Sequence, residues 1–509
     1  MKKGLKKLMA VALATTVLFG NLQTALACTG IYIGKDVSVD GTIMIGRSED
    51  IGSGYTKKFL IHEGKTYNNG EMFTDAYGFS MPYPKVTYTY SACEDSLEYD
   101  EGERPYGEVG MNENGVGITA TVSASAHAEA KEVDPLVDTG ICEISMTEVV
   151  LMQAETAKDG IEKLAKIIDE YGAGEGNIIM VADANEAWYM EILTGHQYAA
   201  MKLPDDKMAV FPNTFMMGAI DVNSEDVIVS KNLVSLAEEN GFLVKEDGMI
   251  HVAKTYGQML SSEGNLYRAW GGYNKITGQL TPLTDDLEID LLQTPHKKMS
   301  VYDVKEILAY RYEDTNMNAN AEGNESVRAI GTPNQAECHV LTFDSDAPAA
   351  VAGVEWLAMG TSEFGIYLPF YSAIMTDTPD AFQEDSKYYS DDSVYWAFRA
   401  VGALAALDRE QYGEGIANYY YAYQKGLMEA QEAIAPQMEA LYKADPVAAA
   451  EKANALAEAV TEETLAIVKS IYNELMQYVA ASEGKTQKEP FIPSVALDNV
   501  MPTYSFDAK

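Results

Sequence analysis

A β-hairpin predicted near the start of the chain constrains the fold more than any other pattern. Ile31 and Ile33 alternate with other residue types, which predicts a strand that begins almost at Cys28. Residues 36–41 are rich in turn formers, and residues 42–47 (TIMIGR) predict a second strand. An extended, paired segment therefore follows Cys28 almost at once.

The two predicted strands bring a charged pair back towards Cys28. Residues equidistant from the turn of an antiparallel hairpin face each other, so we expect Cys28 opposite Ser48, to within a residue or two. Arg47 and Asp50 then lie near the thiol. Burying such a pair is costly unless it has a task, although an Arg–Asp pair at a strand end is more commonly a surface feature.

The segment before Cys28 has the three parts of a secretory signal. Residues 1–27 begin with four lysines, continue with an apolar run at 8–19 and end in Ala-Leu-Ala, a typical A-x-A cleavage site. The apolar run is too short to cross a bilayer core comfortably. We expect a protein that is secreted or held in the cell envelope, with Cys28 exposed as its first residue by signal peptidase or by self-cleavage.

A lipoprotein signal is the alternative interpretation of this junction, with Cys28 as a lipid anchor. Such signals usually carry Leu three residues before the cysteine and a polar tether after it. Here Ala25 holds that position, and a strand follows the cysteine. A lipid-anchored binding protein at the cell surface therefore remains the non-enzyme alternative.

An N-terminal cysteine combines a nucleophile and a base in one residue. A free α-amino group has a pKa of about 7.7–8.0, so it can accept the thiol proton near neutral pH, directly or through water. Arg47 would favour the thiolate by charge attraction. Asp50 would hold the ammonium group or the amine of a substrate. The pattern therefore predicts acyl transfer at Cys28.

Composition excludes several classes of partner and site. The chain has 509 residues and a net charge of −40, which repels nucleic acid and anionic lipid headgroups. No stretch after residue 27 is long and apolar enough for a membrane span. The cysteines show no CxxC spacing and HExxH is absent, so we expect no metal and no organic cofactor.

Four cysteines in a chain of this length do not form a disulfide scaffold. One disulfide among Cys93, Cys142 and Cys338 is compatible with an oxidising compartment, and the sequence leaves this open. Cys338 and His339 resemble a catalytic dyad, but adjacent strand residues face opposite sides of a sheet. A structural role is the stronger interpretation of that pair.

The rest of the chain predicts a layered α+β fold with antiparallel sheets. Residues 147–171 are expected to form one amphipathic helix capped by Thr147, and a hairpin is expected at 178–192. Residues 383–482 are mostly helical, with one apolar stripe that packs against the body. Residues 483–509 are expected to form a loose tail.

The start of the predicted mature chain resembles the N-terminal nucleophile hydrolases. Cys28-Thr29-Gly30, followed by the hairpin and Gly46-Arg47-Ser48-Glu49-Asp50, is most similar to the cysteine dipeptidases of the dipeptidase A family. Penicillin V acylases and bile salt hydrolases are more distant relatives. The resemblance implies an αββα four-layer sandwich over residues 28–382, with Cys28 as nucleophile and base and with Arg47 and Asp50 as its active-site partners.

Further motifs extend the resemblance over roughly residues 28–480. Residues 110–116 (GMNENGV) match the family's G-x-N-E-x-G-V turn. Asn213 stands where the family places an oxyanion-binding asparagine. Independently of the family, Arg268 could bind a substrate carboxylate through its planar guanidinium.

Two departures bear on the substrate. Thr214 follows Asn213 where the dipeptidases often have His, and residues 118–122 lack the asparagine expected of an acylase. The second departure favours a peptidase over an amidase of the bile salt hydrolase or penicillin V acylase type, which remains the alternative enzyme. We expect hydrolysis of short peptides, above all dipeptides, through a thioester, by a homo-oligomer.

Overall fold

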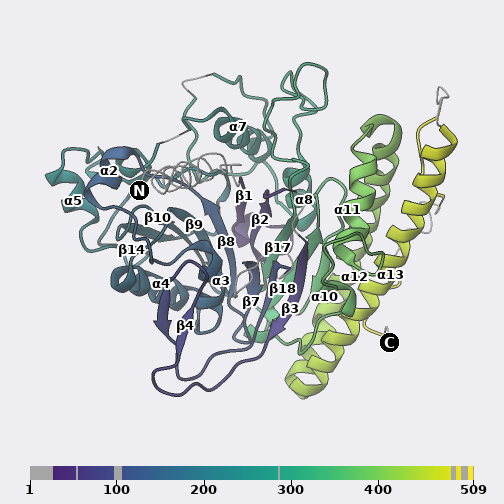
Figure 1. The fold of residues 1–509 in the computed structure, drawn as a ribbon, viewed down its shortest axis with the longest axis horizontal. Helices are drawn as coiled ribbons and strands as arrows, with labels where there is room; N and C mark the ends of the chain where they lie inside the picture. Colours follow the sequence, from purple (N-terminus) through teal and green to yellow (C-terminus); the bar gives the residue numbers. More distant parts are fainter. Residues whose placement is uncertain are drawn as a thin grey trace, which may run out of the picture.

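The computed structural model describes residues 27–52, 56–96, 106–258, 260–284, 287–482, 489–494 and 502–507. Apart from Ala27, the predicted signal peptide lies outside these ranges. The protein has a mixed α+β fold with antiparallel sheets and long C-terminal helices (Figure 1).

Cys28 lies at the end of a six-stranded antiparallel sheet with the strand order β12-β1-β2-β17-β18-β19. Its strands are β1 (Thr29–Ile33), β2 (Ile43–Glu49), β12 (Met208–Phe211), β17 (Glu337–Phe343), β18 (Gly353–Met359) and β19 (Leu368–Phe370). The predicted hairpin is confirmed as β1–β2. Thr29, not Cys28, pairs with Ser48, so the register differs by one residue from the expected one.

A second antiparallel sheet of eight strands has the order β14-β11-β10-β9-β8-β7-β6-β3. Its strands are β3 (Lys57–His62), β6 (Tyr90–Asp95), β7 (Gly107–Met111), β8 (Gly117–Ser123), β9 (Asn177–Ala182), β10 (Ala187–Ile192), β11 (Tyr198–Lys202) and β14 (Val227–Val229). The predicted hairpin at 178–192 is confirmed as β9–β10. The GMNENGV segment forms the turn between β7 and β8, where Asn112 Oδ1 accepts the backbone N–H groups of Asn114 and Val116.

The two sheets face each other across a buried core, and helices cover their outer faces (Figure 1). The eight-stranded sheet is covered by α3 (Glu143–Leu151) and α4 (Ala157–Tyr171). The prediction of one helix over 147–171 is therefore wrong. Thr156 caps α4 by accepting the N–H of Asp159, whereas Thr147 is buried within α3 and donates to the carbonyl of Gly107 at 2.7 Å.

The predicted helical region is confirmed, and it packs on the six-stranded sheet. It contains α11 (Val394–Ala405), a π-helix (Arg409–Gly413), α12 (Glu414–Ala444) and α13 (Pro446–Ser482). The stripe of α13 is buried at Leu456, Val460, Val468, Ile471 and Leu475, against α11, α12 and β19. Among the described residues, no helix has both the length and the apolar character needed to cross a membrane.

The described parts of the C-terminal tail are packed, in contrast to the loose tail expected from residue 483. Tyr504 is buried, and its hydroxyl donates to Gln431 Oε1 on α12 at 2.9 Å. The N–H of Phe491 donates to the carbonyl of Gln411 at 2.8 Å. Two buried aromatic side chains therefore hold these segments against the helices.

Shorter elements complete the described fold. They are α2 (Ala128–Val133), α5 (Leu233–Glu239), α6 (Val252–Tyr256), α7 (Glu263–Thr277), α8 (Val301–Ala309), α9 (Ala349–Ala352), α10 (Asp380–Gln383), a 3-10 helix (Lys35–Val37), the strand pair β4 (Met72–Thr74) and β5 (Ser80–Pro82), and the small sheet of β13 (Ala219–Ile220), β15 (Lys245–Glu246) and β16 (Met249–His251).

Candidate active site

Cys28 is buried at the start of β1, with the guanidinium of Arg47 beside its sulfur. Arg47 Nη2 lies 3.4 Å from Cys28 Sγ. Burial raises the pKa of the Cys28 thiol, and the positive charge of Arg47 opposes that shift. The predicted partnership of the two residues is therefore present in the fold.

Arg47 is held in place by the opposite sheet. From β2 its side chain crosses the core, where Nη1 donates to the carbonyl of Ala120 at 2.5 Å and Nη2 pairs with Glu108 Oε2 at 3.1 Å. Burial lowers the pKa of Arg47, but the negative charges of Cys28 and Glu108 raise it well above its usual value. The cation beside the thiol is thus permanent and fixed.

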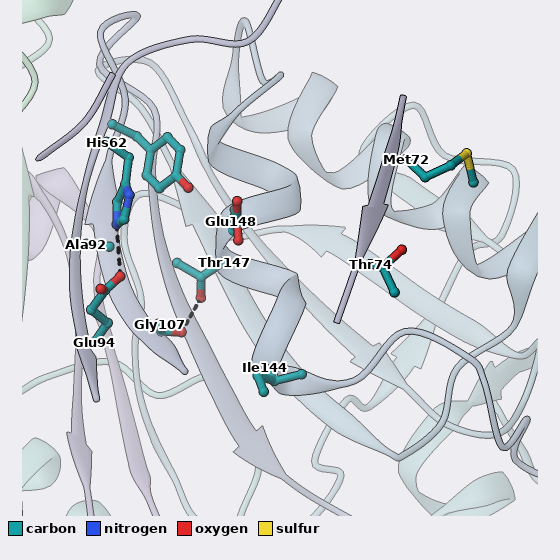
Figure 2. A pocket seen from close by; sticks show the side chains of 10 residues that line it. His62, Met72, Thr74, Ala92, Glu94, Gly107, Ile144, Thr147 and Glu148 are labelled. Carbon is teal, nitrogen blue, oxygen red and sulfur yellow. Dashed lines mark hydrogen bonds and ion pairs between the residues drawn. The ribbon is translucent and has the colours of Figure 1, made fainter. Parts of the chain in front are cut away.

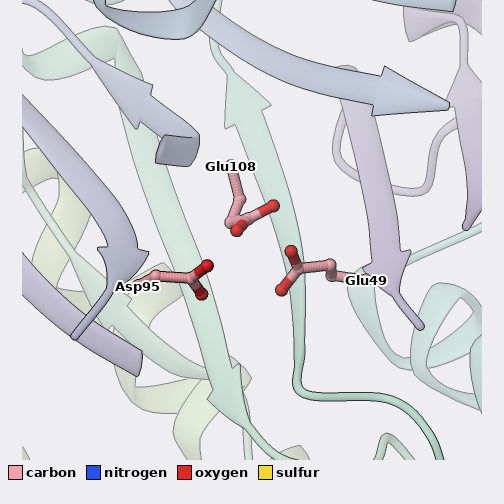
Figure 3. Close-up of side chains that lie close together, drawn as sticks. All are labelled: Glu49, Asp95 and Glu108. Carbon is pink, nitrogen blue, oxygen red and sulfur yellow. The ribbon is translucent and has the colours of Figure 1, made fainter. Parts of the chain in front are cut away.

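Glu108 belongs to a wholly buried group that we call the Lys57 cluster: Lys57, Glu49, Asp95 and Glu108. The three carboxylates lie close together (Figure 3), in an arrangement that could surround a metal ion. The Lys57 ammonium already stands among them, 2.5 Å from Glu49 Oε2 and in ion pairs with Asp95 and Glu108. Lys57 and Arg47 supply two cations to the three carboxyl groups, and burial together with the charge of Glu49 raises the pKa of Glu108 well above its usual value, which favours its neutral form.

Asp50 lies on another side of Cys28, at the end of β2. Its Oδ2 forms an ion pair with Arg328 Nη2. Burial raises the pKa of Asp50, while the charges of Arg328 and Arg268 lower it. Ala27 completes this group: its N–H donates to the Asp50 carbonyl at 3.4 Å, and its own carbonyl accepts from Arg328 Nη2 at 3.0 Å.

Asn213 follows β12 and is oriented by Arg268 from α7. Arg268 Nη2 lies 2.9 Å from Asn213 Oδ1, and because arginine has no acceptor, this contact fixes the amide oxygen towards Arg268. The other amide atom, Nδ2, is buried and has no hydrogen-bond partner among the described residues. Asn213 therefore keeps an N–H donor free for another group.

Arg268 itself contacts the backbone of the nucleophile. Its Nη1 donates to the Cys28 carbonyl, its Nη2 also bonds Asn265 Oδ1 at 2.7 Å, and its Nε bonds the Gly264 carbonyl at 3.1 Å. Only 2% of the residue is exposed. Burial and the charge of Arg328 lower its pKa to about 9. The carboxylate-binding role assigned to it from the sequence stays a prediction.

With this geometry in place, the comparisons with known proteins decide the family. The family model described as peptidase family C69 matches residues 27–422. The chain belongs to peptidase family C69.

Several relatives of this C69 chain carry dipeptidase names. A protein of Streptococcus pyogenes serotype M1 named probable dipeptidase B is 34% identical over 93% of this chain and 97% of the relative. Proteins named probable dipeptidase from Latilactobacillus sakei and Salmonella dublin are 29% and 31% identical, over 79% and 72% of this chain and 85% and 84% of the relatives.

Sequence reasoning missed a carboxylate that holds the C69 chain's Asn213 segment. Glu191 on β10 accepts at Oε1 the N–H groups of Met216 and Met217, at 2.6 and 2.9 Å, and the Tyr189 hydroxyl at 2.8 Å. Burial raises the pKa of Glu191 to about 7. The Trp-Tyr-Met-Glu stretch of β10 was the only signal, because a glutamate in a fully buried strand needs partners.

The remaining cysteines of the C69 chain are free thiols, so no disulfide forms among Cys93, Cys142 and Cys338. Cys338 Sγ points to the Gly360 carbonyl at 3.8 Å, whereas His339 Nε2 lies 2.8 Å from Thr119 Oγ1 across the core. As predicted, Cys338 and His339 do not act as a pair.

A separate cavity of about 480 Å³ lies near α3, β3, β6 and β7 (Figure 2). His62 and Glu94 line it, with His62 Nε2 2.8 Å from Glu94 Oε2. Its lining includes none of Cys28, Arg47 and Asn213. It is therefore distinct from the site around the thiol.

Proposed function

We propose that this chain is a cysteine-type dipeptidase whose nucleophile is Cys28. One observation carries the proposal: the Cys28 thiol lies against a fixed cation, in a C69 chain whose relatives are named dipeptidases. Thiol acyl transfer needs a nucleophile, a charge that favours its thiolate and a donor for the oxyanion. The proposal is supported by the contact of Arg47 with the Cys28 sulfur and by the N–H of Asn213 Nδ2 that has no partner among the described residues. Arg268 is bonded to both Cys28 and Asn213.

The proposed reaction begins once the chain up to Ala27 has been removed. The α-amine of Cys28 accepts the thiol proton, and the thiolate attacks the carbonyl of the peptide bond. Asn213 Nδ2 donates to the oxyanion of the tetrahedral intermediate. The ammonium then protonates the leaving amine, and water hydrolyses the thioester.

Two features of the molecule support the wider assignment to the N-terminal nucleophile hydrolases. The layer order of helices, sheet, sheet and helices agrees with an αββα sandwich. Cys28 stands at the start of the first strand of that arrangement. We propose export through residues 1–27 as the route that unmasks Cys28, since this segment has the composition of a secretory signal.

The decisive experiment combines N-terminal sequencing, intact mass and kinetics of the exported protein. We expect a chain that begins at a free Cys28 and hydrolyses dipeptides. Cys28→Ala should lower kcat/KM by at least about 10³-fold, as expected for loss of a nucleophile. Cys142→Ala, which removes a thiol remote from the site, should leave the activity unchanged. Full activity in Cys28→Ala, or a diacylglyceryl adduct on Cys28, would contradict the proposal.

A further inference from the structure

Arg328 is the arginine near Cys28 whose contacts depend on the residue that maturation removes. Its Nη2 donates to the Ala27 carbonyl at 3.0 Å and pairs with Asp50. Its side chain is 24% exposed, whereas Arg47 and Arg268 are 1% and 2% exposed. Once Ala27 has been removed, Arg328 has lost an acceptor beside the nucleophile and still faces solvent.

We propose that Arg328 binds the α-carboxylate of the leaving residue, so that the enzyme selects dipeptides with a free C-terminus. The inference rests on the proposed dipeptidase function. A guanidinium is suited to this task because it donates to a carboxylate in a fixed, planar geometry.

Covalent geometry limits the distance between Arg328 Nη2 and the carboxylate of the leaving residue. The Ala27 carbonyl oxygen is two bonds from the Cys28 nitrogen, so Arg328 Nη2 lies within about 6 Å of that nitrogen. The leaving amine must come within about 3 Å of the same nitrogen to receive its proton. The carboxyl carbon of the leaving residue is two bonds from that amine, about 2.5 Å away. These distances allow the carboxylate of the leaving residue to contact Arg328.

The two other arginines around Cys28 are less suited to bind a carboxylate. Arg268 uses Nε and both Nη atoms on protein acceptors. Arg47 is fixed between the thiol and Glu108. When Ala27 has left, Asp50 Oδ2 at Nη2 and the Ala329 carbonyl at Nη1 keep the Arg328 guanidinium oriented, and the N–H of Nη2 that bonded Ala27 becomes available.

The test compares L-alanyl-L-alanine with its C-terminal amide. The wild-type enzyme should favour the free dipeptide by about 10- to 100-fold in kcat/KM, the range expected for one charge-assisted hydrogen bond. Arg328→Met should abolish this preference by raising KM for the free dipeptide more than KM for the amide. Arg328→Lys should restore part of it.

The control is Arg409→Met, because the Arg409 side chain has the same 24% exposure and pairs with Glu363 away from the site. It should keep the wild-type preference. Two results would overturn the inference and leave the dipeptidase assignment intact. One is a wild-type kcat/KM for the free dipeptide less than about threefold above that for the amide. The other is an equal loss of kcat/KM for both substrates in Arg328→Met and Arg328→Lys. A wild-type enzyme that hydrolyses no dipeptide would overturn both.

Discussion

Two groups of charged and polar residues flank Cys28, and they differ in which of their hydrogen-bonding groups are free of protein partners. The Lys57 cluster and Arg47 are buried, and their charged ends pair with one another. The second group, Asp50, Asn213 and Arg328, includes a donor without a partner among the described residues and a guanidinium in contact with solvent. The first group holds the site together and fixes Arg47 beside the thiol, whereas the second contains the groups that we expect to contact the substrate.

We therefore expect substitutions in the two groups to affect different properties, the stability of the fold in one case and catalysis in the other. A change in the Lys57 cluster should act mainly on folding, because it leaves uncompensated charge in the core. A change in the second group should act mainly on kcat at Asn213 and on KM at Arg328, because we expect both side chains to contact the reacting molecule.

The largest effect is expected for Lys57→Met. Glu49 and Asp95 would lose their cation and Glu108 would keep only Arg47, so the free energy of unfolding should fall by about 3–5 kcal/mol. Urea denaturation measures this loss. Lys305→Met is the matched control: Lys305 is equally buried but donates to the carbonyls of Ser362 and Gly365, and burial lowers its pKa to about 7. An equal loss of unfolding free energy in both variants would show that Lys57 stabilises the fold no more than another buried lysine.

A somewhat smaller effect, and on rate instead of stability, is expected for Asn213→Ala. Loss of one oxyanion donor should lower kcat about 10²- to 10³-fold, or about 2.7–4 kcal/mol, with KM and the unfolding midpoint little changed. Steady-state kinetics with urea denaturation of the same preparation checks both parts. If kcat falls less than tenfold, the oxyanion is bound elsewhere.

Glu191→Gln should have a smaller effect on kcat than Asn213→Ala. Glu191 contacts the segment after Asn213 only through the backbone N–H groups of Met216 and Met217. Exchanging a carboxylate for an amide should weaken its bonds to Met216 and Met217 by about 1 kcal/mol, which lowers kcat roughly fivefold.

The pH dependence of the Glu191→Gln effect has a defined sign. With a pKa of about 7, Glu191 is ionised above that pH and binds the segment best there, so the difference from wild type should be largest at pH 8–9 and shrink below pH 6. Glu355→Gln, at another buried glutamate with a pKa of about 7, should leave kcat unchanged. A loss of kcat independent of pH would contradict this role.

The smallest effect is expected at the separate cavity of Figure 2. Burial lowers the pKa of His62, but the hydrogen bond and charge of Glu94 outweigh it, so the net pKa is raised. A raised pKa gives stability that is complete below about pH 6.5 and is lost as pH rises through the folded-state value. His62→Gln should therefore lower Tm at pH 5.5 and leave it unchanged at pH 9. Because the His62 side chain is 35% exposed, the loss of unfolding free energy at pH 5.5 should be less than about 1 kcal/mol.

His251→Gln is a control for which we expect the opposite pH dependence of the change in stability. Burial and the charge of Lys254 lower the pKa of His251, so protonation of this ring destabilises the fold. Replacing it should cost less stability at pH 5.5 than at pH 9. The same pH trend in both variants would contradict the assignment of His62 and Glu94 as an ion pair.

Local patterns predicted the parts of the site that are close in sequence. Alternation identified the β1–β2 hairpin, and the hairpin alone brings Arg47 and Asp50 back to Cys28. The register was one residue off because the turn contains a 3-10 helix and Gly41 in a left-handed conformation, which alternation does not reveal.

Long-range partners could not be predicted in this way. Glu108 and Arg328 lie 61 and 278 residues from the groups they pair with, Arg47 and Asp50, and no local pattern links them. The sequence analysis did not single out Lys57, because the three carboxylates that enclose it come from other strands. A charged residue at a position of a strand that faces the core would have indicated such a buried ion pair.

Arg47 also has a mechanical consequence. The residue lies on β2 in one sheet, and its guanidinium bonds Ala120 and Glu108 in the other. Its Nη2 also contacts Cys28 Sγ. Any sliding of one sheet over the other would therefore pull the guanidinium away from the sulfur. We therefore expect the packing between the two sheets to influence how closely Arg47 approaches the Cys28 thiol.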